Sequence, residues 1–272
     1  MLLIQLLMKP PFSTISLNSV SCFLCNARSV VNKLDELHQL LYSGGHDIVF
    51  VTESWLHSGV TDGLLDPDCK FRIFRKDRTN SRGGGVCVFI KNCWQALPVT
   101  LTTEFIDLEI LCFDLLAFSS RVRFFVTYRP PSYDSTAIHY LCNVIKCVSS
   151  HESENHTNVI LGDLNLPKIN WSSLSSINDI LHKQFLSFIV ESGYCQLVDF
   201  ATHNENILDI VLTTDMHLFS YVKPDIPFGT SDHTSVKFTM IFNNDSNSLQ
   251  KMISHIASII GVLLILRLLK LI

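Results

Sequence analysis

The chain has 272 residues, of which 47% are hydrophobic and 17% charged. This composition excludes a wholly disordered protein, and the length is enough for one large domain with a sizeable core. The formal net charge of −4 gives no overall basic surface, so a nucleic-acid partner would have to be bound by a local patch. The chain has nine cysteines, which is an odd number, and most of them lie in apolar runs. This pattern is typical of small buried side chains in a reducing compartment and not of a disulfide framework.

The first part of the chain predicts a strand, a helix and a second strand. Ile15–Cys25 is apolar and ends in the polar Asn26, while Val30–Leu41 carries apolar residues at helical spacing. A continuous apolar run follows at Ile48–Thr52 and delivers Glu53 at its end. Open α/β sheets bind ligands at the carboxyl ends of their strands, so both polar residues are candidates for a site.

A basic segment at residues 62–82 is polar and rich in turn-forming residues, and we expect it to be a loop. It holds Arg72, Arg75, Lys76, Arg78 and Arg82. Two interpretations stay open, namely a solvated loop and a surface that contacts backbone phosphates.

The middle of the chain predicts three strands and a helix. The strands are Val86–Ile90, Leu108–Leu115 and Val122–Tyr128, and the helix is Thr136–Ser149. Two prolines follow at positions 130 and 131, where they end the ladder and leave Tyr128 at a strand end.

The segment Asn158–Pro167 combines a short apolar run with two polar side chains. The run is too short for a helix and stops at Gly162, after which come Asp163 and Asn165. One interpretation is an ordinary turn, because Asp and Asn bond well to their own backbone. The other is a buried strand that holds a carboxylate and an amide at the rim of a sheet.

The last third predicts one helix and three strands. These elements are the helix Asp179–Ser192 and the strands Gln196–Phe200, Ile207–Thr213 and Ser235–Met240. Asp209 lies inside an apolar run, and because a buried unpaired carboxylate is costly, we expect it to have a partner. Ser231, Asp232 and His233 come just before the final strand.

The two ends of the chain predict segments outside the domain. We expect an N-terminal extension at 1–14, a domain at 15–242, and a polar linker with a hydrophobic tail at 243–272. The tail is near the length of a membrane span, so one interpretation is a tail anchor in which Arg267 and Lys270 reach the headgroups. The alternatives are a helix packed on the domain or a partner, and the stub of a longer chain.

Polar residues terminate almost every predicted strand, and most of them suit metal or phosphate chemistry. They are Asn26, Glu53, Tyr128, Asp163, Asn165, Asp209, Asp232 and His233. Four carboxylates and one histidine without a cysteine cluster favour a hard, oxygen-liganded cation such as Mg²⁺.

Seven short motifs make the chain resemble a known superfamily. In order they are Cys25–Ser29, Thr52–Leu56, Arg82–Val86, Tyr128–Pro131, Gly162–Asn165, Leu208–Val211 and Ser231–His233. This ordered set resembles the endonuclease/exonuclease/phosphatase superfamily, and within it most closely the apurinic-type endonuclease domain of LINE-type (non-LTR) retrotransposon proteins. The resemblance covers about residues 15 to 240.

The resemblance implies an α/β (α+β) fold of the DNase I type, a four-layer sandwich of two packed mixed sheets with helices outside. It also implies phosphodiester hydrolysis with Mg²⁺, or with Mn²⁺ as an alternative. Glu53 would be the main metal ligand, with Asn26 and Asp232 contributing to the metal site. Some nuclease relatives have an acid two residues after the first Asn, where this chain has Arg28, so the number of metal ions stays open.

The resemblance also implies catalytic roles. Asp163 would orient or deprotonate the attacking water, Asn165 would position it, and Tyr128 would donate to the developing charge. Asp209 would orient His233, which would bind or protonate a phosphoryl oxygen. Four residues would bind substrate, namely Arg78, Arg82, Arg129 and Ser231.

The function expected from the resemblance is a DNA endonuclease that nicks one strand of a target duplex and exposes a 3′ end for reverse transcription. Full retrotransposon proteins of this type continue into a reverse transcriptase, and because we expect no such region in these 272 residues, we expect a fragment, a domesticated copy or a decayed copy. We expect an intracellular, nuclear protein, with a tail-anchored membrane form as the alternative, and the sequence indicates no particular protein partner. Two other functions stay open: an inactive remnant or binding module, and a phosphatase acting on lipid or nucleotide phosphates.

Overall fold

Two six-stranded mixed sheets form the centre of the protein in a computed structural model that describes residues 18–79, 81–101, 108–150, 156–176 and 179–242. The first sheet contains, in spatial order, β13 (Phe219–Asp225), β14 (Ser235–Phe242), β1 (Asn18–Asn26), β2 (Ile48–Thr52), β4 (Val86–Lys91) and β3 (Phe71–Lys76). The second contains β11 (Cys195–Gln196), β12 (Asp209–Thr213), β8 (His156–Asp163), β7 (Ser120–Tyr128), β6 (Glu109–Ala117) and β5 (Gln95–Pro98).

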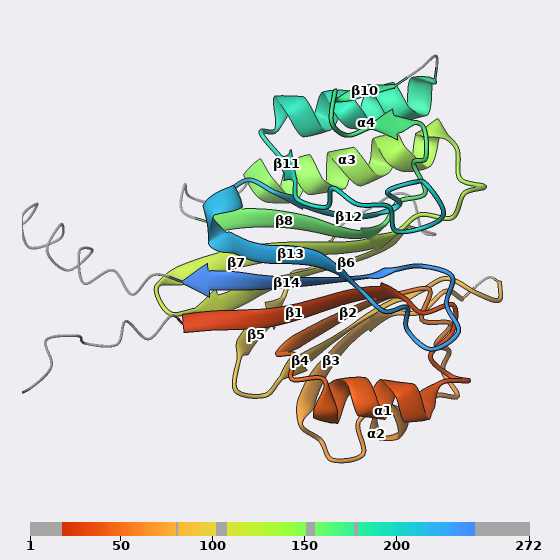
Figure 1. The fold of residues 1–272 in the computed structure, drawn as a ribbon, viewed down its shortest axis with the longest axis vertical. Helices are drawn as coiled ribbons and strands as arrows, with labels where there is room; N and C mark the ends of the chain where they lie inside the picture. Colours follow the sequence, from red (N-terminus) through yellow and green to blue (C-terminus); the bar gives the residue numbers. More distant parts are fainter. Residues whose placement is uncertain (1–17, 80, 102–107, 151–155, 177–178, 243–272) are drawn as a thin grey trace, which may run out of the picture. The chain divides into compact units, whose positions relative to one another are not determined.

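Helices cover the outer face of each sheet (Figure 1). On the first sheet these are α1 (Leu34–Ser43) and the short α2 (Asp62–Leu65); on the second they are α3 (Ser135–Ser150) and α4 (Ile180–Glu191). Smaller elements are the pair β9 (Ile169–Asn170) and β10 (Ser175–Ser176) and the 3₁₀ turn η1 (Met216–Leu218). The predicted four-layer sandwich is therefore confirmed.

The inner faces of the two sheets meet in a core of aromatic and branched side chains. Phe50 of the first sheet lies 5.3 Å from Phe124 and 6.4 Å from Phe113 of the second, measured between ring centroids. All three rings are fully buried. Burying a Phe side chain contributes about 1.5–3 kcal/mol, so this layer is what holds the two sheets together.

Both sheets contain a parallel pair of strands, and these pairs position the polar strand ends. β1 runs parallel to β2, and β7 runs parallel to β8. All five residues of β2 are buried, which explains why this strand is a continuous apolar run rather than an alternating one. Parallel neighbours end at the same edge, so Asn26 and Glu53 come together in one sheet, and Tyr128 and Asp163 in the other.

The structure corrects three predicted elements. The basic segment is not a loop, because it contains α2 and the edge strand β3, in which Phe71, Ile73 and Phe74 are interspersed with basic residues. The first helix begins at Leu34 instead of Val30, since the preceding residues form a turn. The predicted strand at 196–200 is confined to β11.

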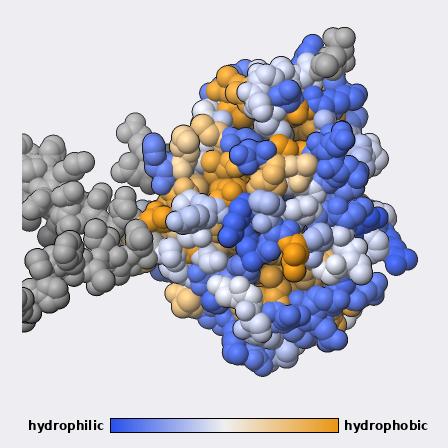
Figure 2. Space-filling view, viewed as in Figure 1, coloured by the Kyte–Doolittle hydropathy of each residue, from blue (hydrophilic) through white to orange (hydrophobic). Residues whose placement is uncertain are grey.

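Hydrophilic side chains cover most of the face seen in Figure 2, with hydrophobic ones interspersed. Five of the nine cysteines are buried, as predicted for small apolar side chains, whereas Cys69, Cys93, Cys147 and Cys195 are exposed. In the described part of the chain, no helix has the length and apolar character needed to cross a bilayer. The predicted extension at 1–14 and the tail at 243–272 lie outside the described residues.

Candidate active site

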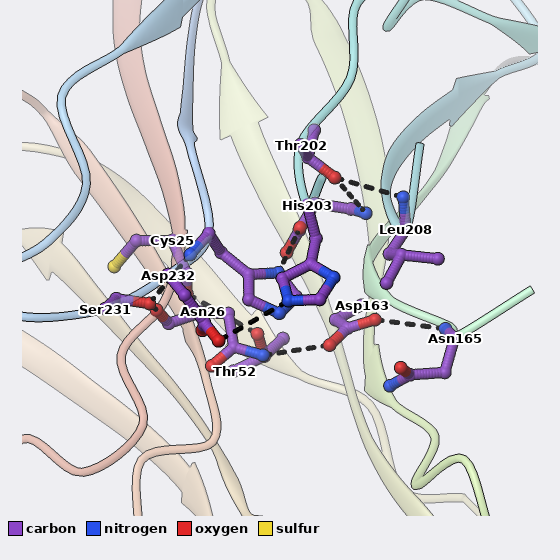
Figure 3. A network of polar contacts seen from close by, with 12 residues as sticks. Cys25, Asn26, Thr52, Asp163, Asn165, Thr202, His203, Leu208, Ser231 and Asp232 are labelled. Atoms are coloured by element: carbon purple, nitrogen blue, oxygen red, sulfur yellow. Dashed lines mark hydrogen bonds and ion pairs between the residues drawn. The ribbon is translucent and has the colours of Figure 1, made fainter. Parts of the chain in front are cut away.

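The carboxyl ends of strands from both sheets meet at one point, and a single amide joins them. Asn26 at the end of β1 donates through Nδ2 to Oε1 of Glu53 at 3.0 Å, within its own sheet. The same nitrogen donates to Oδ2 of Asp163 at 2.8 Å, on the opposite sheet (Figure 3). The amide oxygen of Asn26 accepts the backbone N–H of Arg28 at 3.1 Å, which fixes the orientation of the amide. Asn26 therefore holds two carboxylates of the predicted site side by side.

The backbone that follows β1 and β2 is strained. Arg28, Ser29, Glu53 and Trp55 have positive φ values of 43°, 85°, 49° and 55°. Such conformations cost roughly 1–3 kcal/mol each for residues other than glycine, and they cluster at functional sites. The two turns support each other, because the N–H of Ser29 donates to the carbonyl of Glu53 at 2.8 Å. The strained backbone conformations thus position the side chains that follow β1 and β2.

Asp163 is the central residue among those that the second sheet contributes to the site. It is buried, and its Oδ1 accepts the backbone N–H of Asn165 at 3.0 Å (Figure 3). Asp209 is its direct cross-strand neighbour in the antiparallel pair of β8 and β12. Burial, and then the negative charge of Asp209, raise the pKa of Asp163 well above its ordinary value. A raised pKa suits a carboxylate that takes up a proton near neutral pH.

Asp209 and His233 form a buried pair. Nδ1 of His233 and Oδ2 of Asp209 are 2.7 Å apart, and Oγ1 of Thr202 accepts the backbone N–H of Asp209 at 3.0 Å. Burial alone would lower the pKa of His233, but the hydrogen bond and the charge of Asp209 outweigh it, so this pKa is raised. The Asp209 carboxylate accordingly fixes the ring and favours its protonated form.

Tyr128 and Asn165 complete the group. Tyr128 is almost fully buried, and burial followed by the charges of Glu53 and Asp163 raises the pKa of its hydroxyl, which keeps it protonated as a donor. Asn165 has φ +49° and donates through Nδ2 to the carbonyl of Arg129 at 3.0 Å, which fixes its amide at the rim of the site.

The donor set of this group fits a hard divalent cation. Ligand atoms of Asp163, Asp209 and His233 all lie within 4.8 Å of one another. Oδ1 of Asp209 is buried and has no hydrogen-bond partner in the structure, an arrangement that costs free energy unless a cation or donor binds there. Together with Glu53 and Asn26 these groups offer mainly oxygen, as Mg²⁺ prefers. The residues present therefore fit the metal that the sequence predicts.

The structure places Asp232 at the edge of the predicted metal site. Its Oδ2 accepts Nη1 of Arg28 at 2.6 Å and lies 3.4 Å from Nε2 of His203, and its side chain is 48% exposed. The role of Asp232 as a metal ligand stays a prediction.

Internal partners engage three of the four predicted substrate-binding residues. Arg78 donates through Nε to Oε1 of Glu109 at 2.7 Å, and its side chain is only 18% exposed. Arg129 donates to the carbonyls of Leu164, Asn165 and Tyr133, so it braces the segment that carries Asn165. Ser231 donates to the carbonyl of Asn26 at 2.7 Å. The guanidinium of Arg82 lies 5.4 Å from the centre of the Trp55 ring.

Five residues at the site have contacts that the motifs did not predict: Arg28, Lys33, Trp55, Thr202 and His203. Nε1 of Trp55 donates to Oε2 of Glu53 at 3.2 Å, and the ring of His203 stacks on His233 with centroids 4.6 Å apart. Arg28 and Trp55 lie within the motifs Cys25–Ser29 and Thr52–Leu56, so the sequence does indicate that they are near the site. Lys33, Thr202 and His203 carry no such signal.

Comparisons with known proteins agree with the fold. A family model described as "Endonuclease-reverse transcriptase" matches residues 122–237. No curated protein sequence matches the chain.

Solved structures share the fold at low sequence identity. The endonuclease domain of TRAS1, a telomere-specific non-LTR retrotransposon, is 15% identical with a TM-score of 0.62, and the match covers 82% of this chain and 98% of that one. The AP endonuclease LMAP from Leishmania major is 12% identical with a TM-score of 0.63, over 83% of this chain and 88% of that one. A 3′ phosphatase from Neisseria bound to a product DNA hairpin is 12% identical with a TM-score of 0.60, over 82% and 100%.

Proposed function

This chain has the fold of the endonuclease/exonuclease/phosphatase superfamily, and on that premise we propose that it is a Mg²⁺-dependent DNA endonuclease that nicks one strand of a duplex. The observation that carries the proposal is the convergence of Glu53 and Asn26 from one sheet with Asp163 and the Asp209–His233 pair from the other. Phosphodiester hydrolysis needs a positioned water, a proton acceptor and positive charge around the phosphate, and this group can supply all three.

The chain's own residues have distinct tasks in the proposed reaction. Asp163, with its raised pKa, accepts a proton from the water that attacks phosphorus, while Asn165 orients that water. His233, held by Asp209 and favoured in its protonated form, donates to a phosphoryl oxygen as negative charge develops. The hydroxyl of Tyr128 donates from the Glu53 side of the site.

The metal would be held mainly by Glu53, with Asn26 as a further ligand. When bound, Mg²⁺ supplies positive charge that neutralises nonbridging phosphate oxygens. DNA is favoured as substrate because the three structures described above are a retrotransposon endonuclease domain, an AP endonuclease and a phosphatase bound to DNA. We further propose that the nick exposes a 3′ end for reverse transcription and that the protein acts in the nucleus.

Incubation of the purified protein with supercoiled plasmid tests the proposal. We expect Mg²⁺-dependent conversion to nicked circles that stops in EDTA. Asp163→Asn and His233→Gln should each reduce the rate by about 10²–10⁴-fold, the usual loss for a proton-transfer group. Lys70→Ala, which removes an exposed cation paired with Asp68, is the matched control and should leave the rate unchanged.

Two outcomes would contradict the proposal: absence of nicked circles with the wild-type protein, and nicking that survives both site substitutions. A duplex carrying a 3′ phosphate tests the second candidate, which the Neisseria phosphatase structure brings forward. Release of inorganic phosphate without nicking would favour a phosphatase, and loss of both activities a binding module.

A further inference from the structure

Arg28 places a cation at the mouth of the candidate site. Its guanidinium makes one hydrogen bond within the described part of the chain, from Nη1 to Oδ2 of Asp232 at 2.6 Å. The side chain is 51% exposed, so Nε and Nη2 remain able to donate to a ligand. Arg28 also lies near enough to Glu53 for the charge of that carboxylate to act on it.

Three other cations around the site are less available than Arg28. Arg78 is paired with Glu109, and Arg129 is buried among carbonyl groups. Lys33 is buried and donates to the carbonyls of Ala27 and Arg28 at 2.5 and 3.5 Å. Arg28 is thus the exposed arginine that is tied to the loop carrying His233.

The backbone around Arg28 is built to hold that position. Arg28 and Ser29 both have positive φ, which residues with a Cβ rarely adopt, so this turn persists only if its surroundings stabilise it. Lys33 stabilises it through two successive carbonyls, those of Ala27 and Arg28, and the N–H of Val30 donates to the carbonyl of Ser54 at 3.0 Å. A cavity of about 380 Å³ opens beside the turn and is lined by Arg28, Lys33 and Trp55, among others.

We propose that Arg28 binds a backbone phosphate of the DNA next to the cleaved bond, and that Asp232 holds the guanidinium in place until the substrate arrives. The proposal rests on the nuclease function proposed above and adds a substrate contact to it. An arginine fork matches the two nonbridging oxygens of a phosphodiester, and its planar group is preorganised by its partner carboxylate. Lys33 is a positioning residue in this scheme, because it contacts the turn and not the substrate.

A double-substitution experiment tests the contact. Nick sites of the wild-type protein are first mapped on a plasmid, and duplexes are then made in which one phosphate at a time near the nick is a neutral methylphosphonate. Arg28→Ala should weaken binding, measured by fluorescence anisotropy in EDTA, by about 10–100-fold, as expected for loss of a charge-assisted hydrogen bond. The slope of log K against log salt should become shallower by about 0.9, the value for one phosphate.

The decisive result is non-additivity. At the contacted phosphate, the methylphosphonate should weaken binding of the wild-type protein but cause no further loss in Arg28→Ala. Arg28→Lys should restore part of the affinity, and Lys70→Ala should behave like the wild type at that phosphate. Fully additive losses at every phosphate near the nick would overturn the proposal.

Asp232→Asn separates the proposed role of Asp232 from that of a metal ligand. If Asp232 holds Arg28, this substitution should weaken DNA binding in the wild-type background and cause no further loss in Arg28→Ala. It should leave the Mn²⁺ affinity, measured by electron paramagnetic resonance, unchanged. A large loss of Mn²⁺ affinity would overturn this part. If the wild-type protein nicks DNA and Arg28→Ala binds and cleaves DNA equally well, the Arg28 contact alone is refuted. If the wild-type protein neither nicks nor binds DNA, the nuclease function is refuted as well.

Discussion

Replacement of Gly162 by alanine tests whether the strand that carries Asp163 depends on the absence of a side chain. Gly162 has φ +132°, in a region that is essentially restricted to glycine. A Cβ added there would overlap the carbonyl oxygen of Thr127 on the neighbouring strand β7, and it would lie 2.9 Å from that residue's carbonyl carbon. Neither atom can move without disturbing the ladder between β7 and β8, which carries Tyr128 and Asp163 at its end.

Two other glycines allow the magnitude to be worked out. Gly63→Ala in α2 meets no atom within 4 Å and should change stability by less than about 1 kcal/mol, in the stabilising direction. Gly45→Ala meets no atom either, but has φ +73°, so it should cost about 1–2 kcal/mol in backbone strain alone. Gly162→Ala adds steric overlap of about 1–3 kcal/mol to strain of about 1–3 kcal/mol, so we expect about 2–6 kcal/mol.

The assay is urea unfolding of the three variants and the wild type, followed by circular dichroism, with the free energy of unfolding compared at a common denaturant slope. Plasmid nicking by Gly162→Ala should fall further than its folded fraction explains, because the change displaces Asp163. A loss of stability for Gly162→Ala no larger than that for Gly45→Ala would refute the argument from steric overlap.

Further predictions concern titration and a buried ion pair. Asp209→Asn should shift both limbs of the pH profile of nicking to lower pH, because the Asp209 carboxylate raises the pKa of both Asp163 and His233; a pH–rate series with unmoved limbs would contradict this. Asp114→Asn should cost about 3–5 kcal/mol in urea unfolding, because it removes the carboxylate that lies 2.7 Å from the fully buried Arg123. Burial opposes ionisation of Asp114, but the hydrogen bonds from its arginine partners lower its pKa, so the stabilisation is present above the ordinary pKa of an aspartate and is lost as the pH falls through the lowered value. A wild-type unfolding series in acid that parallels that of Asp114→Asn would contradict this assignment.

The sequence predicts the sheets and most of the site because polar residues at strand ends are a local signal. Asp163 and Asn165 follow a run of apolar residues that is fully buried in the structure, and Asp209 lies in another such run. The expectation that Asp209 needs a partner was correct, and the partner is His233. Burial could be inferred from the pattern of apolar neighbours, and a partner from the cost of burying a charge.

The remaining features depend on contacts between segments far apart in the chain. The sequence of the basic segment predicts a loop because its basic residues obscure the pattern of the edge strand β3. Arg78 is paired with Glu109, which lies 31 residues away in the chain. The pairing of Arg28 with Asp232 spans 204 residues. In neither pair does the sequence around one residue predict the other residue. These pairs follow only from how the two sheets pack.

The order of strands in the first sheet has a consequence for the synthesis of the protein. β1 is the first described strand, yet β14, the last, lies beside it and fills one of its two edges. On the ribosome that edge stays open until nearly the whole domain has emerged, and Ser231, which anchors the carbonyl of Asn26, arrives equally late. For most of translation, the nascent chain therefore exposes one edge of a strand that is largely buried in the folded protein. Such exposed edges favour aggregation, so we expect the nascent domain to bind chaperones. The site can form only when the two ends of the domain have met.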